Sequence, residues 1–532
     1  MQTAPDANLA ALVARQAGQR PDFRVLTFVN VGADGALEDE TRTFAELHAH
    51  AGALAAQLKA LGIGPGKTFA IMMANHPEFV EAMLAAAWLG AAFVPIDPRV
   101  VGDKLRYMLE HAECEGAICT ADCAAAIRRL GTPVGRLQWL VVAGDDVSPD
   151  RPGGLREIAY RDAIAARGDR PPIAATAPAD PMMMMFTSGT TGNPKAVVLP
   201  FGQYMAAAYN GTAFGIRDDD VLYTGLSLTH INAQTTLRRA LGGALPAVIS
   251  RKFTKSRLWD IVRGYDCTVF NLLGGMIPEI YATPETPEDA DNPLRLVISA
   301  GMPDNLWTEY ERRFGVRICE IYGSTEGGGA LVNLPGEGPI GSMGRPVAGS
   351  EAACFNEAGE RCKPHEPGEL RFRRTDGSAI TVNYLKNPDA SAEKVRDGWF
   401  RTGDIAHADE NGWFFFRYRV GGGVRKNGDF VSTALVESGI SKSGLVADVY
   451  VYGVNTPKNV AGEKYLVAAV VPHDPATFTT AALIAYCRGH LEKNDVPDIV
   501  QVLDEIPRTI SEKPIERACI ELLGDPLARR PE

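Results

Sequence analysis

A polar segment between two apolar runs restricts the fold of this chain more than any other feature. The segment Thr187–Lys195 reads TSGTTGNPK; it follows the run Met182–Phe186 and precedes the run Val197–Leu199. Apolar runs of this length are typical of buried strands, so the pattern predicts a tight loop held between two paired strands. The loop offers hydroxyl, backbone N–H and ammonium donors, which suit an anion with several oxygens, and polyphosphate fits best.

An ordinary surface loop rich in turn-forming residues is the alternative interpretation of this segment. The segment also lacks the G-x-x-x-x-G-K-[ST] form of a Walker A motif. If the loop binds an anion, the predicted donors are Thr187, Ser188, Gly189, Thr190, Thr191, Gly192 and Lys195.

Length and charge limit the class of protein. A chain of 532 residues is too long for one compact core, so two or more domains are expected. The net charge of −11 argues against nucleic acid or an anionic membrane surface as a general partner. The longest apolar stretch, Ala82–Val94, is too short to span a bilayer, so no membrane insertion is expected. Nine cysteines, an odd number, predict reduced thiols and a cytoplasmic location.

Helical and strand patterns alternate up to about residue 400. Phe44–Ala60 and Pro77–Leu89 have helical patterns, whereas Phe69–Met73 and Ala92–Ile96 have the patterns of short strands. This alternation predicts an α/β fold, with helices packed on β-sheets.

The glycine content and the pattern of apolar residues change after residue 400. The triplet Gly421–Gly423 is followed by two alternating apolar segments and two helical patterns, enough for a small α+β domain of about 110 residues. We therefore expect a large domain over residues 1–420 and a small one over residues 421–532. Glycines at such a joint favour a hinge near Gly422, although a plain turn is the alternative.

Four further stretches place charged groups in loops. Ile321–Gly327 contains the sequence YGSTE after an expected strand, and Trp399–Asp404 ends in a carboxylate suited to ribose hydroxyls. Arg419 precedes the glycine triplet, and Ile506–Lys513 ends in a lysine near the C-terminus.

Singly, each stretch has a plainer interpretation: Glu326 as an acid at a helix N-terminus, Asp404 as a turn former, and Lys513 as a solvated charge. Together, in this order and spacing, the polar loop and these stretches resemble the adenylate-forming superfamily of acyl-CoA synthetases, peptide-synthetase adenylation domains and luciferases. The resemblance covers nearly the whole chain. It implies a large nucleotide-binding N-terminal domain and a small mobile C-terminal lid.

The resemblance also implies a reaction in two halves. A carboxylate first attacks the α-phosphate of Mg-ATP, which gives an acyl adenylate and pyrophosphate; a thiol, usually that of coenzyme A, then displaces AMP. Lys513 would bridge the attacking carboxylate and the α-phosphate, Thr325 would touch that phosphate, and Glu326 would help to hold Mg²⁺. The implied catalytic residues are Lys513, Thr325, Glu326 and His230.

ATP-binding residues beyond the polar loop follow from the same resemblance. Asp404 would accept hydrogen bonds from the ribose with Arg419 nearby. The segment Gly301–Pro303 would line the adenine, and Tyr322 would stack on it. The implied set is Gly301, Met302, Pro303, Tyr322, Gly323, Ser324, Asp404 and Arg419.

The acid pocket is implied to lie around His230, with a satisfied structural histidine as the alternative. Its residues would be His230, Asn232, Ala233, Gln234, Ala300 and Gly327, and the residues at the hinge or near coenzyme A would be Gly422, Arg425 and Gly428.

The pocket segment looks most like ligases of the carnitine and crotonobetaine type. Its amides, together with that of Asn271 further along the chain, favour a short or functionalised acid, because a long alkyl chain would leave them buried and unpaired. The alternative is that these amides cap backbone groups and leave an apolar pocket.

Some positions depart from the family pattern. Gly422 stands where the hinge usually carries Asp or Lys, and Tyr418 precedes Arg419 where Asp or Gly is usual. Leu435 replaces one of two paired acids, and Glu512 replaces the glycine that usually precedes the lysine at position 513. The thiol-transfer half is therefore less certain than the adenylation half.

The leading prediction is an acid–CoA ligase that uses ATP, Mg²⁺ and coenzyme A. Its partners would be a small carboxylic acid and coenzyme A, with no nucleic acid, and a homodimer is a further candidate assembly. Two alternatives stay open: an adenylating enzyme that passes its acyl group to a carrier-protein thiol or an amine, and a nucleotide-binding regulator.

Overall fold

The computed structural model describes the chain except for a set of short segments. The segments outside the described residues are 1–5, 7, 132, 145–146, 148–154, 166–168, 188–193, 357, 420–422, 427–428, 456–463, 492, 510–511 and 525–532.

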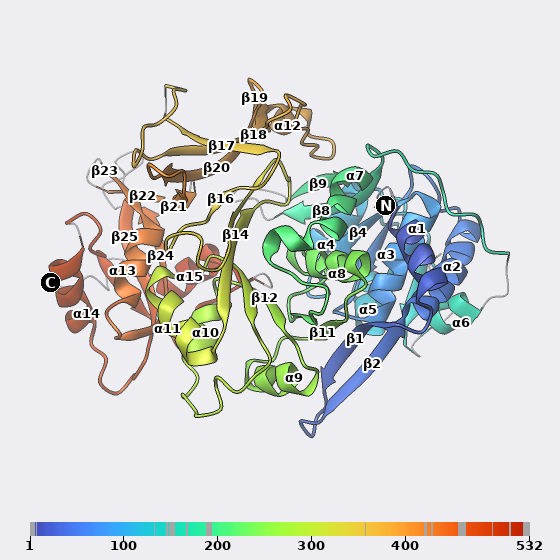
Figure 1. Cartoon of the computed structure of the whole chain (residues 1–532), viewed down its shortest axis with the longest axis horizontal. Helices are drawn as coiled ribbons and strands as arrows, with labels where there is room; N and C mark the ends of the chain where they lie inside the picture. The colour runs from blue at the N-terminus through green and yellow to red at the C-terminus, as the bar shows by residue number, and fades with distance from the viewer. Residues whose placement is uncertain are drawn as a thin grey trace.

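Two large sheets form the N-terminal part of the molecule (Figure 1). In the seven-stranded sheet all neighbours pair in parallel except β8 and β9, which form an antiparallel hairpin. Its order is β7 (Arg156–Ala159), β6 (Trp139–Ala143), β5 (Gly116–Thr120), β3 (Thr68–Met72), β4 (Ala92–Ile96), β8 (Pro181–Thr187) and β9 (Lys195–Pro200).

The nine-stranded sheet is parallel in its centre and antiparallel at both edges. Its order is β16 (Arg345–Pro346), β15 (Ala330–Asn333), β14 (Arg317–Gly323), β13 (Leu296–Ala300), β12 (Val269–Leu273), β10 (Leu222–Thr224), β11 (Ala247–Ser250), β1 (Arg24–Val31) and β2 (Leu37–Thr43).

Helix α8 (Ile231–Gly243) lies between these two sheets. On one side Arg238 packs over the ring of Tyr204, which in turn contacts Phe93 of β4 edge to face. On the other side α8 packs against β10 and β11 of the nine-stranded sheet. A single apolar core therefore joins the sheets, and helices α1 (Leu9–Gln19), α2 (Phe44–Ala60) and α3 (Pro77–Leu89) contribute to it.

A third sheet sits at the top of Figure 1 and carries β21 (Phe414–Arg419) paired on β20. Its other strands are β17 (Ser350–Phe355), β18 (Gly368–Arg374), β20 (Trp399–Ala408) and β19 (Val395–Arg396), and α12 (Pro388–Lys394) precedes β19.

The C-terminal residues, red and orange in Figure 1, have cores of their own. They pack onto the rest of the molecule beside α10 (Met276–Tyr281), and Lys442 pairs with Asp304 at 3.5 Å. The elements are β22 (Gly423–Lys426), β23 (Asp429–Ser432), α13 (Thr433–Ser441), β24 (Val446–Asn455), β25 (Lys464–Pro472), α14 (Thr480–His490), β26 (Ile499–Val502) and α15 (Glu516–Leu523).

The structure confirms the α/β prediction and its element assignments. Helices α2 and α3 and strand β4 have the predicted bounds, and the polar segment does connect two antiparallel strands, β8 and β9. The division at residues 420/421 and the hinge at Gly422 stay predictions, because residues 420–422 lie outside the described residues.

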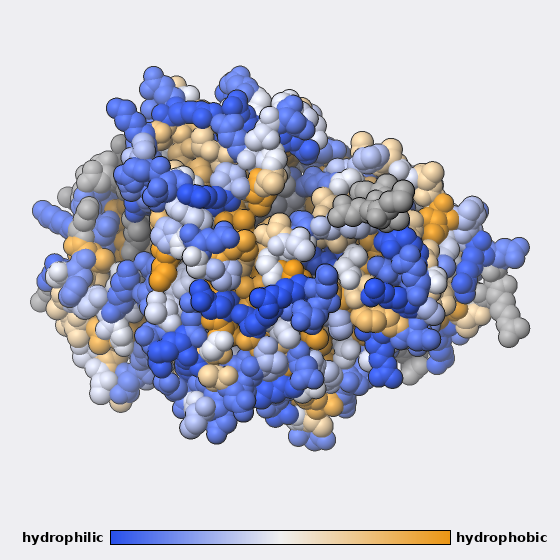
Figure 2. Space-filling view, in the orientation of Figure 1, coloured by the Kyte–Doolittle hydropathy of each residue, from blue (hydrophilic) through white to orange (hydrophobic). Residues whose placement is uncertain are grey.

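The cysteines and the surface agree with an ordinary globular chain. Eight of the nine cysteines are buried and Cys362 is half-buried. Within the described part, no helix is both long enough and apolar enough to cross a membrane. On the face shown in Figure 2, hydrophobic residues (orange) are scattered among hydrophilic ones (blue).

A glycine on α8 tests how tightly this helix is packed. A Cβ added at Gly242 would lie 2.0 Å from the backbone oxygen of Ala208, so Gly242→Ala should destabilise the protein by about 1–3 kcal/mol. In the control Gly18→Ala on α1, the added Cβ would meet no described atom within 4 Å, so stability should rise by up to about 1 kcal/mol. Urea unfolding of both variants measures this; equal stabilities would contradict the packing.

Candidate active site

The candidate site lies where β12, β13 and β14 end. These strands are parallel, so their carboxyl ends meet at one edge of the sheet. The turns there approach each other closely: a Cβ at Gly274 would lie 2.4 Å from the oxygen of Gly301. Gly301 itself has a φ of +97°, which side-chain-bearing residues rarely adopt. Glycine is therefore required at the turn predicted to lie along the adenine.

Glu320, on β14, holds this turn in place. The N–H of Gly301 donates to its Oε1 at 2.6 Å, and the N–H of Met302 donates to its Oε2 at 3.1 Å. Burial raises the pKa of Glu320 to about 7, although both hydrogen bonds oppose the rise. Sequence reasoning missed this residue; the signal was a charged side chain between the apolar residues Cys319 and Ile321 of the strand.

Asp404 is fixed by two side chains from different elements. The hydroxyl of Tyr322 donates to its Oδ2 at 2.5 Å, and Nε of Arg419 lies 3.6 Å from its Oδ1. Burial and the neighbouring Asp404 charge raise the pKa of Tyr322, so its hydroxyl stays a donor. The ring of Tyr322 stacks on Phe372, with centroids 6.1 Å apart. The structure thus brings together three of the predicted nucleotide-binding residues.

Glu326 follows β14 and is held by residues that sequence reasoning missed. The hydroxyl of Tyr384 donates to its Oε1 at 2.7 Å, and the side-chain amide of Gln203 donates to its backbone oxygen at 3.1 Å. Burial favours the protonated form of Glu326, but the Tyr384 hydrogen bond and the nearby charge of Lys394 outweigh burial and lower its pKa. The carboxylate is therefore ionised at neutral pH.

Tyr384 also links Glu326 to the polar loop. Its backbone bridges to Val197 of β9, and its ring centroid lies 5.5 Å from Nζ of Lys195. Thr187 donates through Oγ1 to the backbone oxygen of Lys195 at 3.3 Å, which closes the base of the hairpin. The loop is thus rooted beside Glu326, while Ser188, Gly189, Thr190, Thr191 and Gly192 lie outside the described residues.

A single carboxylate suits one class of metal ion. The described residues contain no group of three or more His, Cys, Asp or Glu side chains that could hold a metal. Mg²⁺ does not need such a group, because it is commonly bound by one or two carboxylates, substrate phosphates and water. Glu326 is ionised and keeps acceptor capacity beyond its bond from Tyr384, so it fits a magnesium ion that arrives with a nucleotide.

Lys513 reaches this cluster from the C-terminal part of the chain. The charges of Arg419, Asp404 and Glu326 all act on it. Lys513 keeps solvent exposure, but partial burial and the positive charge of Arg419 lower the pKa of its ammonium, against the opposing effect of the two carboxylates. Predicted site residues from widely separated parts of the sequence therefore influence one another through their charges.

Lys513 lies at the end of a tight backbone turn. The N–H of Thr509 donates to the backbone oxygen of Lys513 at 2.7 Å, and Arg508 beside it makes a two-pronged ion pair with Asp448, at 2.7 and 2.8 Å. Glu512 has a φ of +58°, a conformation that favours glycine. The departure from the family pattern at this position thus keeps the backbone shape that a glycine would adopt.

His230 stands at the entrance to α8. Its Nε2 is buried and has no hydrogen-bond partner among the described residues. Burial lowers the pKa of His230, the charge of Asp97 opposes this, and the charges of Lys513 and Arg99 add to the lowering. His230 is therefore neutral at pH 7 and carries an unsatisfied nitrogen that a ligand could use.

The predicted pocket amides differ in their availability. Asn271 donates through its amide to Oδ1 of Asn232, which places the two side chains together. Gln234 departs from the prediction: it is fully buried, accepts from Tyr204 at 2.7 Å and donates to the backbone oxygen of Leu228 at 2.7 Å. The amide of Gln234 is structural, because its direction is fixed by a tyrosine from another helix.

The remaining predicted residues fall into two groups. In the first group, Ala300 is the last residue of β13, Met302 is buried, and Pro303 precedes α11 (Asp304–Phe314). Ala233 is buried in α8. The hydroxyl of Ser324 donates to the backbone oxygen of Gly327 at 3.2 Å, in the segment that also holds Gly323 and Thr325. For the hinge group, Arg425 lies on β22, whereas Gly422 and Gly428 lie outside the described residues.

Comparison with known proteins assigns the family. The profile described as AMP-binding enzyme matches residues 13–384, and the profile described as AMP-binding enzyme C-terminal domain matches residues 435–513. The chain is 31% identical to a steroid-22-oyl-CoA synthetase of Rhodococcus jostii over 468 residues, 85% of this chain and 81% of the relative. It is 28% identical to a crotonobetaine/carnitine–CoA ligase of Salmonella heidelberg over 471 residues, 86% of this chain and 89% of that protein.

A solved structure agrees on the fold. An anthranilate CoA ligase, AuaEII, in complex with anthranoyl-AMP superposes with a TM-score of 0.84 at 21% identity, over 97% of this chain and 96% of that chain. The family profile covers more than half of the chain, and the fold is that of adenylate-forming enzymes. The chain therefore belongs to the AMP-binding enzyme family.

Proposed function

We propose that this protein is an ATP-dependent acid–CoA ligase that forms an acyl adenylate and then a thioester. The observation that carries the proposal is the pair of carboxylates beside the ends of the parallel strands, Asp404 held by Tyr322 and Glu326 held by Tyr384, whose charges both act on Lys513. Relatives named as CoA ligases and synthetases support the same chemistry.

The first half-reaction sets a carboxylate against a polyphosphate, and like charges must be neutralised and aligned for it to occur. Lys513 supplies a positive charge at the attacking oxygen and the α-phosphate, where it counts most in the transition state. Thr325 adds a hydroxyl donor at that phosphate. The hairpin residues between Thr187 and Lys195 hold the β- and γ-phosphates, and pyrophosphate is the leaving group.

The nucleoside is held by groups that are already in position. Asp404, fixed by Tyr322 and Arg419, accepts from the ribose hydroxyls. The Gly301–Pro303 turn, fixed by Glu320, lies along the adenine. Mg²⁺, when bound with the nucleotide, would neutralise phosphate charge, and Glu326 held by Tyr384 would provide its protein oxygen.

The second half-reaction needs a different arrangement. Lys513 belongs to the C-terminal part and serves only the first half-reaction, so we propose that this part moves before a thiol approaches the adenylate. We place the pivot near Gly422, with Arg425 and Gly428 on the surface that then meets coenzyme A. A carrier-protein thiol or an amine is the alternative acceptor.

Acid-dependent exchange of labelled pyrophosphate into ATP tests the proposal. A panel of small carboxylic acids, run with and without coenzyme A, should give exchange with at least one acid and a thioester only when coenzyme A is present. Exchange without a thioester would favour another acceptor. No exchange with any acid would favour a nucleotide-binding regulator.

Lys513→Ala should separate the two half-reactions. We expect adenylate formation to fall by about 100-fold or more, because a charge aimed at the transition state is lost. Thioester formation from a supplied acyl adenylate should be nearly unchanged, since Lys513 leaves the site for that step. The matched control is Arg517→Ala, which removes an exposed cation of α15 paired with Glu521 at 2.8 Å and should alter neither rate. Equal loss in both half-reactions would exclude the two-position lid.

Glu326→Gln should raise the Mg²⁺ concentration needed for half-maximal adenylation by about tenfold or more, because a charged oxygen ligand becomes neutral. Tyr384→Phe should shift it in the same direction by less, since the carboxylate stays but loses its hydrogen bond. Magnesium titrations of pyrophosphate exchange measure both. The exposed acid Glu285 provides the control Glu285→Gln, and a magnesium dependence equal in all four proteins would remove Glu326 from the metal site.

A further inference from the structure

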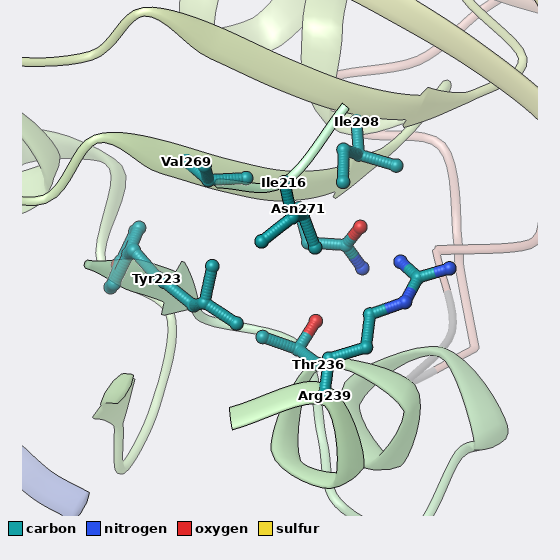
Figure 3. A pocket seen from close by; sticks show the side chains of 8 residues that line it. Ile216, Tyr223, Thr236, Arg239, Val269, Asn271 and Ile298 are labelled. Carbon is teal, nitrogen blue, oxygen red and sulfur yellow. The ribbon is translucent and has the colours of Figure 1, made fainter. Parts of the chain in front are cut away.

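A small cavity lies between α8 and the nine-stranded sheet (Figure 3). Its volume is about 10 Å³, room for about one water molecule. Three polar side chains reach it from facing elements: Thr236 and Arg239 from α8, and Asn271 from β12. In Figure 3 the guanidinium of Arg239 and the amide of Asn271 lie on the same side of the cavity.

Two consecutive arginines are buried beside this cavity. Arg238 and Arg239 are only 3% and 4% exposed. Among the described residues, no carboxylate forms an ion pair with either guanidinium. Buried charges are normally paired, because taking an ion out of water is expensive. The structure therefore holds two adjacent positive charges for which the described part of the chain supplies no counter-ion.

The two arginines differ in how far the protein satisfies them. Arg238 donates to the backbone oxygens of Gln234 and Tyr204 and to the hydroxyl of Thr235, and it stacks over the Tyr204 ring. These contacts occupy all three of its guanidinium nitrogens. Arg238 is thus a structural residue that locks α8 to its neighbours.

Arg239 makes fewer contacts. Its Nε donates to Oδ1 of Asn210 at 3.1 Å, and its guanidinium stacks over Phe214 with 4.1 Å to the ring centroid. A guanidinium has five N–H donors, so most of those on Arg239 have no acceptor among the described residues. Burial, together with the charge of Arg238, lowers the pKa of Arg239 to about 9, so it still carries its proton at neutral pH. Arg239 is therefore a charged group with donors to spare.

One hydrogen bond connects a residue that lines the cavity to a residue of the predicted acid pocket. Asn271, which lines it, donates to Asn232, two residues after His230. Asn232, Thr236 and Arg239 are spaced i, i+4 and i+7, so they share one face of α8. Seven residues of helix span about 10 Å. An acid whose carboxyl lies by Lys513 would thus extend along this face toward Arg239.

We propose that the acid substrate carries a second anionic group, with a carboxylate as the simplest case, and that Arg239 binds it as the specificity-determining residue at the far end of the acid pocket. This proposal rests on the ligase function proposed above. Side chains must yield to admit the group, since the cavity has room for only about one water molecule. Asn271 is placed to donate to the same group.

Matched acids test the proposal. Dicarboxylic acids of increasing length are compared with monocarboxylic acids of equal length that end in a methyl group, by the ratio of their kcat/KM values in pyrophosphate exchange. The wild type should prefer the best dicarboxylic acid by about 100-fold or more, because a site built for a polar group rejects the analogue that lacks it. Arg239→Met, which keeps an unbranched side chain, should lose that preference, and Arg239→Lys should keep part of it.

Arg238→Met is the control, since it removes the neighbouring buried charge but not the one facing the cavity. It should reduce stability and leave the ratio of the two acids unchanged. Calorimetric binding of the dicarboxylic acid to wild type and Arg239→Met, in the presence of a non-hydrolysable ATP analogue, gives a second readout that needs no turnover and so separates this proposal from the ligase function. A wild type that prefers methyl-ended acids, or an Arg239→Met variant with the wild-type ratio and affinity, would overturn the assignment.

Discussion

Carboxyl groups that are buried or half-buried and yet held in place are the constraint on which this site depends. Each of the three is held by donors from a distant part of the chain: Glu326 by Tyr384, Asp404 by Tyr322 and Arg419, and Glu320 by the N–H groups of Gly301 and Met302. These donors offset part of the cost of burying a carboxyl group. The same hydrogen bonds connect β14 to β20 and to the segment before α12.

The positive charges of the site come from two other parts of the chain. Arg419 and Lys513 both lie near Asp404 and Glu326, but they come from the end of the third sheet and from a turn in the C-terminal part. Because the two cations repel each other, a polyanion between them would relieve the repulsion, and its departure would loosen the contact. In the function proposed above, this repulsion would favour a C-terminal part that closes on the nucleotide and leaves when pyrophosphate has gone.

The sequence predicted the elements better than the contacts between them. Helix Phe44–Ala60 and strand Ala92–Ile96 were predicted with their bounds because their apolar periodicity is local. Tyr384, Glu320 and Arg239 were missed because each acts on a partner that only the fold brings close; Tyr384 is 58 residues from Glu326. Gln234 was assigned to the acid pocket because sequence does not reveal the direction of an amide, which Tyr204 fixes.

The central claim is that this site couples an acid to a thiol through an adenylate, and the products of one complete reaction test it most directly. With ATP, Mg²⁺, coenzyme A and an accepted acid, chromatography of the quenched mixture should show AMP and thioester in equal amounts, with pyrophosphate and no ADP. ADP in place of AMP, or AMP formed at the same rate without any acid, would contradict the account.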